Sequence, residues 1–112
     1  MIHDVANTGL SQEVIDKLKN VFSLFPQINR ITLFGSRAKG SYRQGSDIDL
    51  VMECNQLQFD EIMNIEQKLD DLLLPYTIDL LEINNIESEE LLSHIERIGI
   101  TLYESKPSEI MR

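Results

Sequence analysis

The residues best suited to chemistry are two aspartates that lie two positions apart, Asp47 and Asp49. Apolar residues at 48, 50 and 52 alternate with them, which is typical of a β-strand whose successive side chains point to opposite faces. The pattern predicts a strand over 48–52 with both carboxylates on the same side of its beginning. Adjacent ionised carboxylates repel each other, and burying either one without a partner is costly, so we expect a positive group between them.

A divalent cation is the positive group that suits these acids best. Mg²⁺ and Mn²⁺ prefer hard oxygen ligands and bind through a few carboxylates together with substrate phosphate. The preceding turn suits that phosphate, because Gly35 and Ser36 offer backbone N–H groups and a hydroxyl at the start of a short predicted helix. Arg37, Lys39 and Arg43 place three of the chain's ten basic residues in the same turn. Together these features indicate nucleotide chemistry.

The glycine spacing of this turn could be mistaken for a phosphate-binding P-loop. Gly35 and Gly40 have the spacing of the G-x-x-x-x-G-K-[ST] motif, but Ser41 stands where its lysine must be. A Walker A site is therefore excluded.

Alternating strand and helix patterns surround the two aspartates. Strands are expected over 31–34, 48–52 and 76–81, and a last short strand over 100–103. A helix capped by Ser11 is predicted to end at Pro26, a second to run from 59 to 73 before Pro75, and a third to begin after Ser88 and to close at Gly99. Asn84 and Asn85 are expected to form a turn, and 53–58 a polar connection. This order predicts an α/β fold with a sheet of three or four strands flanked by helices, whose strand order the sequence does not fix.

Length and charge limit the function classes. The 112 residues predict one domain over 1–112, with loose termini at 1–10 and 106–112. A net charge of −9, with few basic residues outside the turn, argues against extended nucleic-acid binding. The single cysteine, Cys54, cannot form an internal disulfide, and no stretch resembles a signal peptide or a membrane span. We therefore expect a cytoplasmic protein.

The motif resembles that of a known superfamily. Gly35-Ser36, ten further residues and then Asp47 and Asp49 resemble the G-S-x10-D-x-D signature of the DNA polymerase β-type nucleotidyltransferases, in their minimal (MNT) form. That family carries a third acid on a later strand, and Asp79 lies within the strand-like run 76–81. The motifs cover 31–81, and the whole chain has about the length of minimal members.

The resemblance implies a site and a reaction. It implies a mixed sheet that brings Asp47, Asp49 and Asp79 together around Mg²⁺. Two ions are expected, with Mn²⁺ as an alternative to Mg²⁺. An acceptor hydroxyl attacks the α-phosphate of an NTP, which is expected to be ATP, and pyrophosphate leaves. The turn from 35 to 43 holds the β- and γ-phosphates. Lys39 departs from the arginine that members often carry, which keeps the charge but loses the planar fork.

The resemblance also implies a partner, because minimal members work with a HEPN-type helical protein. In some pairs the helical protein is a toxin and the small transferase is the antitoxin that attaches AMP to it. AMP transfer to a hydroxyl of such a partner is the leading hypothesis, in a homo- or hetero-oligomer. Two alternatives stay open: a module that serves or neutralises a helical partner by binding with little turnover, and a transferase for a small molecule such as an aminoglycoside. Relatives of the last kind carry an added helical domain.

Other residues that could do chemistry are expected to be structural. His3 and His94 lie in the N-terminal lead-in and in an acidic helix, which are poor positions for a metal pair. Cys54 has no nearby base that would lower its pKa, so a nucleophilic role is not expected. Glu53 shares the strand side of Asp49 but lies about 13 Å further along, so it should face solvent.

Overall fold

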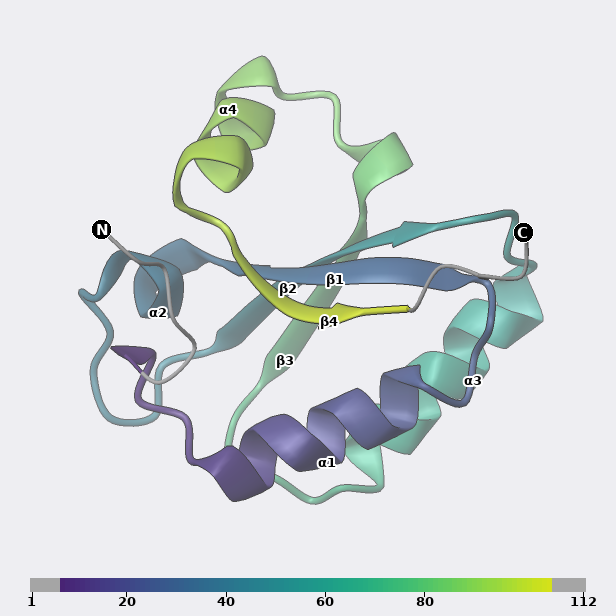
Figure 1. Cartoon of the computed structure of the whole chain (residues 1–112), viewed down its shortest axis with the longest axis horizontal. Helices are drawn as coiled ribbons and strands as arrows, with labels where there is room; N and C mark the ends of the chain where they lie inside the picture. Colours follow the sequence, from purple (N-terminus) through teal and green to yellow (C-terminus); the bar gives the residue numbers. More distant parts are fainter. Residues whose placement is uncertain (1–6, 106–112) are drawn as a thin grey trace, which may run out of the picture.

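The computed structural model describes residues 7–105, and Figure 1 shows them as a twisted sheet with helices on both faces. Its elements, in chain order, are α1 (Gln12–Phe22), β1 (Ile28–Phe34), α2 (Gly35–Lys39), β2 (Ile48–Cys54), α3 (Phe59–Asp70), β3 (Ile78–Glu82), the 3₁₀ helix η2 (Ile83–Asn85), α4 (Glu89–Ile98) and β4 (Ile100–Glu104). The expected α/β class is confirmed, and the sheet, expected to have three or four strands, has four.

The sheet is mixed, and its strand order is β3-β2-β1-β4. β1 runs antiparallel to both β2 and β4, whereas β2 and β3 run parallel and are joined through α3. β3 and β4 are therefore the two edges of the sheet. In the parallel pair, Asp49 of β2 lies directly opposite Asp79 of β3.

The main core lies between the sheet and the two longer helices, α1 and α3, which Figure 1 shows below the strands. The apolar positions of α1 recur at helical spacing, and Leu18 and Phe22 have no exposed surface. Ile65 of α3 and Leu33 and Leu50 of the strands are equally buried. This packing supplies the hydrophobic stabilisation that holds β2 and β3 in register.

The opposite face of the sheet carries a smaller apolar cluster under α4. Its buried members are Phe34 at the end of β1, Val51 of β2 and Ile95 of α4. Because Val51 alternates with Leu50 along β2, the two side chains lie on opposite faces of the sheet. The cluster fixes Phe34 on the same face of the sheet as Asp49, which alternates with Leu50 in the same way.

The predicted helix starts are confirmed, but two of the predicted ends are too late. The Ser11 hydroxyl accepts the Val14 N–H at 3.2 Å and caps α1, and Ser88 caps α4 in the same way. α1 ends at Phe22, well before Pro26. α3 ends at Asp70 rather than at 73, because Leu73 has a φ of +55°, which a right-handed helix cannot include.

Strand boundaries differ from the predicted ones by a few residues. β1 begins at Ile28, β3 spans Ile78–Glu82, and β4 closes the sheet as expected. β2 continues through Cys54, so the polar connection predicted over 53–58 is wrong for its first two residues. Asn84 and Asn85 belong to a 3₁₀ helix, which is the hydrogen-bonded form of the predicted turn.

Gly99 ends α4 for a reason of space. Its backbone is extended, with a φ of −62°, so no left-handed conformation demands glycine. A Cβ at this position would collide with the Ile95 carbonyl oxygen and would lie 2.6 Å from Thr32 Cγ2. Glycine lets α4 turn directly into β4 against the sheet.

The N-terminal lead-in is only partly as expected. Thr8 and Leu10 are buried, and Leu10 joins the main core, so residues 7–10 are not loose. Residues 1–6 and the predicted frayed tail 106–112 lie outside the described residues. Within 7–105, no helix combines the length and the apolar character needed to cross a bilayer.

Candidate active site

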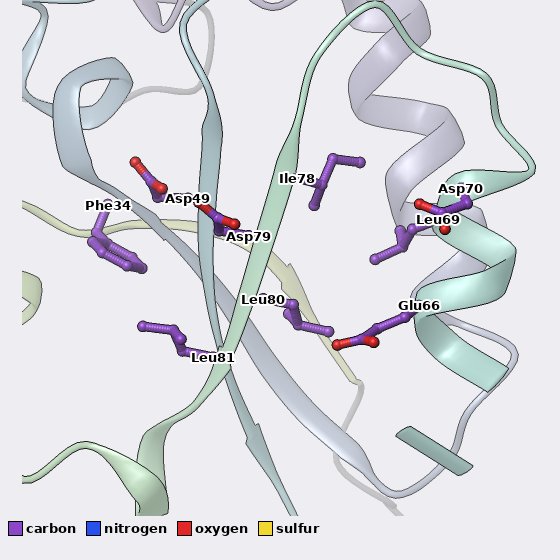
Figure 2. A pocket seen from close by; sticks show the side chains of 9 residues that line it. All are labelled: Phe34, Asp49, Glu66, Leu69, Asp70, Ile78, Asp79, Leu80 and Leu81. Carbon is purple, nitrogen blue, oxygen red and sulfur yellow. The ribbon is translucent and has the colours of Figure 1, made fainter. Parts of the chain in front are cut away.

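The site is built around two acids on neighbouring parallel strands. Asp49 is half-buried and Asp79 is exposed, and their strand positions pair across the sheet. Figure 2 shows both carboxylates on the same side of β3, with Phe34 and Leu81 on that side as well. The packing of β2 against β3 therefore holds two acids together in a fixed arrangement.

The environment of Asp49 disfavours its ionised form. Burial raises the pKa of its carboxyl above the ordinary value of 3.8, and the charge of Asp79, the charge of Asp47 and a hydrogen bond with Asp79 raise this pKa further. The ion pairs formed by residues 7–105 are Lys17–Glu13 and Arg30–Glu53, and neither includes these acids. The acids thus repel each other without a basic side chain from these residues to offset the repulsion.

Asp47 lies at the margin of this pair. It precedes β2, is exposed and does not line the pocket that contains Asp49 and Asp79. Within 7–105, no three histidine, cysteine, aspartate or glutamate side chains are already arranged to hold a metal ion. The structure therefore brings two of the three predicted acids together, while the third affects Asp49 through its charge.

Gly35 brings the beginning of α2 against Asp49. It has a φ of +77°, and a Cβ at this position would collide with Asp49 Oδ2 and lie 3.1 Å from Asp49 Cγ. Only glycine combines this backbone conformation with so close an approach. The predicted proximity of the glycine–serine turn to the acids is confirmed at Gly35, and the half-buried Ser36 follows it in α2.

A pocket of about 460 Å³ opens along β3 beside the acids. Figure 2 shows that Asp79 and Leu81 face the side of Phe34, whereas Ile78 and Leu80 face α3. Acidic and apolar side chains line it, and none of the described residues in this lining is basic. Such a lining could accept a cation, or the phosphates of a nucleotide only together with one.

The chain matches a known protein family over most of its length. Residues 16–108 match the family model described as "Polymerase beta, Nucleotidyltransferase". The chain belongs to this nucleotidyltransferase family. A relative from Methanocaldococcus jannaschii, named as a protein adenylyltransferase, is 36% identical over 80 residues, which are 71% of this chain and 72% of that protein.

Solved structures with the same fold include toxin–antitoxin complexes. One, described as a toxin–antitoxin with AMP-PNP, is 26% identical with a TM-score of 0.63, over 87% of this chain and 76% of that chain. Another, from Shewanella oneidensis, is described as a tri-AMPylated HEPN toxin in complex with an MNT antitoxin. It is 22% identical with a TM-score of 0.62, over 86% and 74% of the two chains, and at this identity the likeness shows the fold alone.

Of the three basic residues that were predicted to contact phosphate, two are exposed in this nucleotidyltransferase. Lys39 ends α2, and Arg43 lies in the turn before β2, beside a separate pocket that includes Tyr42 and Tyr76. Arg37 is different, because only 2% of its surface is exposed and its guanidinium donates to backbone carbonyls. The expectation that Arg37 contacts phosphate is therefore corrected, since the side chain is buried and three of its N–H groups already donate to carbonyl oxygens of the protein.

Seven of the nine pocket residues were not picked out from the sequence as site residues: Phe34, Glu66, Leu69, Asp70, Ile78, Leu80 and Leu81. Three of them carry a signal that could have found them. Leu81 has the strand parity of Asp79, and Phe34 directly precedes Gly35. Glu66 interrupts an otherwise apolar helical stripe, which is the usual sign that a polar side chain faces a site or solvent.

Of the remaining candidates, His94 and Cys54 behave as structural residues, Glu53 needs a correction, and His3 lies outside the described residues. His94 packs edge-on against Phe34, with 6.3 Å between ring centroids. Burial raises the pKa of the Cys54 thiol, with a further contribution from Glu82, so its thiolate is disfavoured. Glu53 does not simply face solvent, because it pairs with Arg30 across β1 and β2 at 3.0 Å.

Proposed function

We propose that this nucleotidyltransferase transfers AMP from ATP to a hydroxyl group of a HEPN-type helical partner protein. The name of the Methanocaldococcus relative supports protein as the acceptor, and the toxin–antitoxin structure with AMP-PNP supports an adenine nucleotide as the donor. The same structure is described as a toxin–antitoxin complex, which supports a toxin as the partner, and the HEPN class follows from the resemblance to minimal nucleotidyltransferases. The observation that carries the proposal is the pairing of Asp49 with Asp79 beside Gly35.

Members of this family generally use divalent metal ions, and the acids of this chain fit one chemically. Three carboxylates without a basic partner among residues 7–105 supply the hard oxygen ligands that Mg²⁺ or Mn²⁺ prefers. In this proposal Asp47, Asp49 and Asp79 hold two Mg²⁺ ions, with Mn²⁺ as a substitute. When bound, the ions would neutralise the phosphoryl oxygens and favour ionisation of the acceptor hydroxyl.

The remaining roles fall to the turn and to the β3 side of the pocket. Gly35 and Ser36 orient the β- and γ-phosphates through backbone N–H groups and a hydroxyl, and the exposed Lys39 adds positive charge, with Arg43 further away. The acceptor oxygen forms a bond to the α-phosphorus, while the bond from the α-phosphorus to pyrophosphate breaks. The exposed carboxylate of Asp79 takes the hydroxyl proton. Catalysis then rests on positioning and charge stabilisation.

The test is transfer of label from α-labelled ATP to a HEPN-type helical protein of the same organism, beginning with the product of the neighbouring gene. Asp49→Asn and Asp79→Asn should each reduce transfer by about 100-fold or more, because each removes charge stabilisation that acts in the transition state. Asp16→Asn, which neutralises an exposed acid on α1, is the matched control and should transfer like the wild type. Undiminished labelling by the Asp49 variant would falsify the assignment.

The alternative function is neutralisation of the partner by binding alone, and the wild type and a variant of Asp49 distinguish it from catalysis. The lack of an assembled three-acid metal site within 7–105 is the observation that favours it. If Asp49→Ala still neutralises the partner in cells and no label is transferred by the wild type, the protein acts by binding. Loss of neutralisation together with loss of labelling supports the enzyme, which we place in the cytoplasm with its partner.

A further inference from the structure

Arg37 forms a buried cross-link at the base of the active site. Its Nε and Nη2 groups both donate to the Ser46 carbonyl oxygen, at 3.1 and 3.0 Å. Its Nη1 group donates to the Thr8 carbonyl oxygen at 2.8 Å. Only 2% of the residue is exposed, and among the described residues no carboxylate pairs with it. The guanidinium is thus compensated by backbone oxygens in a water-poor position.

Two tyrosines complete the surroundings of this cation. The guanidinium carbon lies 5.2 Å from the centroid of the Tyr42 ring and 4.8 Å from that of Tyr76, both within the range of a cation–π interaction. Gly9 leaves room for the arrangement, because a Cβ there would collide with the Tyr42 ring and lie 3.0 Å from Arg37 Nη1. Arg37 therefore touches three segments besides its own helix.

Two of these segments, those of Ser46 and Tyr76, directly precede catalytic acids in the chain. The Ser46 carbonyl belongs to the peptide group that joins Ser46 to Asp47, so the fork on this oxygen holds the backbone of Asp47 itself. Tyr76 lies three residues before Asp79, in the loop that enters β3. Arg37 sits two residues after Gly35, whose backbone lies against the Asp49 carboxylate. One guanidinium thereby links the approaches to all three acids.

We propose that Arg37 is a positioning residue that fixes Asp47, and through Tyr76 the β3 segment of Asp79, relative to Asp49. This inference rests on the proposed function and deepens it. Asp47 needs such support, because it precedes the hydrogen-bonded part of β2 and is exposed. An arginine suits the task because its planar fork can grip one oxygen with two N–H groups while its faces stack on aromatic rings, and lysine can do neither.

The first test compares Arg37→Lys with Arg30→Lys. Arg30 is a matched control, because its guanidinium also donates two hydrogen bonds, to Glu53 at 3.0 and 3.3 Å, but lies on the sheet away from the acids. In Arg37→Lys, kcat should fall by about 100-fold with KM for ATP little changed, because misplacing a catalytic group by about 1 Å costs that much. Arg30→Lys should keep the wild-type kcat whatever its melting temperature.

A second readout needs no turnover. Mn²⁺ binding, measured by water-proton relaxation, should weaken about tenfold or more in Arg37→Lys and stay unchanged in Arg30→Lys, because loosening one oxygen ligand lowers the affinity of the whole set. Amide hydrogen exchange at Ile48, the residue after Asp47, should be faster in Arg37→Lys, because its N–H donates to the Thr77 carbonyl oxygen at 2.9 Å, while exchange in the middle of β1 stays protected. Should Arg37→Lys bind Mn²⁺ and protect the Ile48 amide as the wild type does, the inference is wrong.

Tyr76 keeps the inference testable if Arg37→Lys does not fold. Tyr76→Phe retains the ring face and should resemble the wild type, whereas Tyr76→Leu should weaken Mn²⁺ binding and lower kcat without a large change in KM. Equal behaviour of these two variants would contradict the proposed cross-link. If the wild type transfers no AMP, the proposed function fails, and Mn²⁺ binding and amide exchange at Ile48 still decide the role of Arg37.

Discussion

Among single residues, Asp49 gives the clearest indication of a functional site. A half-buried acid whose pKa is raised by burial and by two neighbouring acids destabilises the fold whenever it is ionised. Such an arrangement serves no purpose in a purely structural role, because an amide of the same shape would avoid the repulsion. Perturbed acids of this kind concentrate at functional sites, where a charged ligand offsets the cost.

Asp49→Asn should stabilise the metal-free protein at neutral pH. The folded-state pKa of Asp49 lies above the unfolded-state value, so below about pH 3.8 the carboxyl is protonated in both states and the repulsion is absent. As the pH rises through the folded-state pKa, the wild type loses stability that the variant retains. Urea unfolding in a metal chelator, at several pH values, measures the difference between the two proteins.

The difference in free energy of unfolding should be near zero at the acidic end and should favour the Asp49→Asn variant at pH 7. Asp16→Asn provides the control, because its carboxyl is exposed on α1, away from the acids of the site. It should show no comparable gain in stability at neutral pH. A wild type that is at least as stable as Asp49→Asn at neutral pH would show that Asp49 is not destabilising.

Among the elements, the junction between β1 and α2 sets the position of the site. Gly35 ends the strand and begins the helix with a positive φ, and its backbone lies against the Asp49 carboxylate. Gly40, at the other end of α2, also has a positive φ, of +86°, but a Cβ there would meet no atom within 4 Å. These two glycines therefore separate the effect of backbone conformation from that of contact with the acid.

Gly40→Ala should cost about 1 kcal/mol of stability, since it adds only the left-handed strain of a non-glycine residue. Gly35→Ala should cost about 2 kcal/mol more, because its methyl group also displaces Asp49, and it should abolish transfer. Chemical denaturation of both variants measures the gap. Asp49→Ala in the Gly35→Ala background should recover part of the stability but no activity, and equal losses for the two glycine variants would contradict the contact.

The acids could be predicted from the sequence because each obeys a local rule. Alternation with apolar residues fixed the side of Asp49, and the apolar run around Asp79 indicated a strand. That these strands are parallel neighbours, with the two acids directly opposite, depends on how α3 packs across the sheet. No spacing within the chain encodes that register, so only the resemblance to the family implied it.

The basic turn shows why the rest of the site could not be predicted. Arg37, Lys39 and Arg43 look alike in a glycine-rich stretch, but burial of the first depends on Thr8, far upstream, and on Tyr76, far downstream. The prediction of a loose lead-in was wrong at Leu10 for the same reason, because the residues that Leu10 packs against come together only in the folded core. Long-range contacts decided these positions.

On the scale of the whole molecule, the net charge of −9 favours cations in general, and the proposed function adds a site at which the acids bind Mg²⁺ or Mn²⁺. A ligand that binds only the folded state, at about 100 times its dissociation constant, adds about 2.7 kcal/mol. Mg²⁺ or Mn²⁺ should therefore raise the melting temperature of the wild type by several degrees and should leave that of Asp49→Asn nearly unchanged. With metal present, the order of stability of the two proteins should reverse.

Scanning calorimetry with Mg²⁺, with Mn²⁺ and with a matched concentration of Na⁺ distinguishes site binding from general screening. The sodium arm should shift both proteins alike, because screening acts on the total charge. Identical responses of the wild type and Asp49→Asn to Mg²⁺ and to Mn²⁺ would show that the acids do not bind these ions.

The position of β3 at the rim of the sheet has a consequence for handling the protein. An edge strand has unpaired backbone N–H and C=O groups that can pair with a strand of another molecule, and natural proteins oppose such pairing with charged side chains. Asp79 on β3 and Asp49 beside it make two approaching copies repel each other. Inactivating this enzyme by neutralising its acids therefore also removes a safeguard against aggregation, so an inactive variant kept for complex crystallisation will need more dilute storage than the active protein.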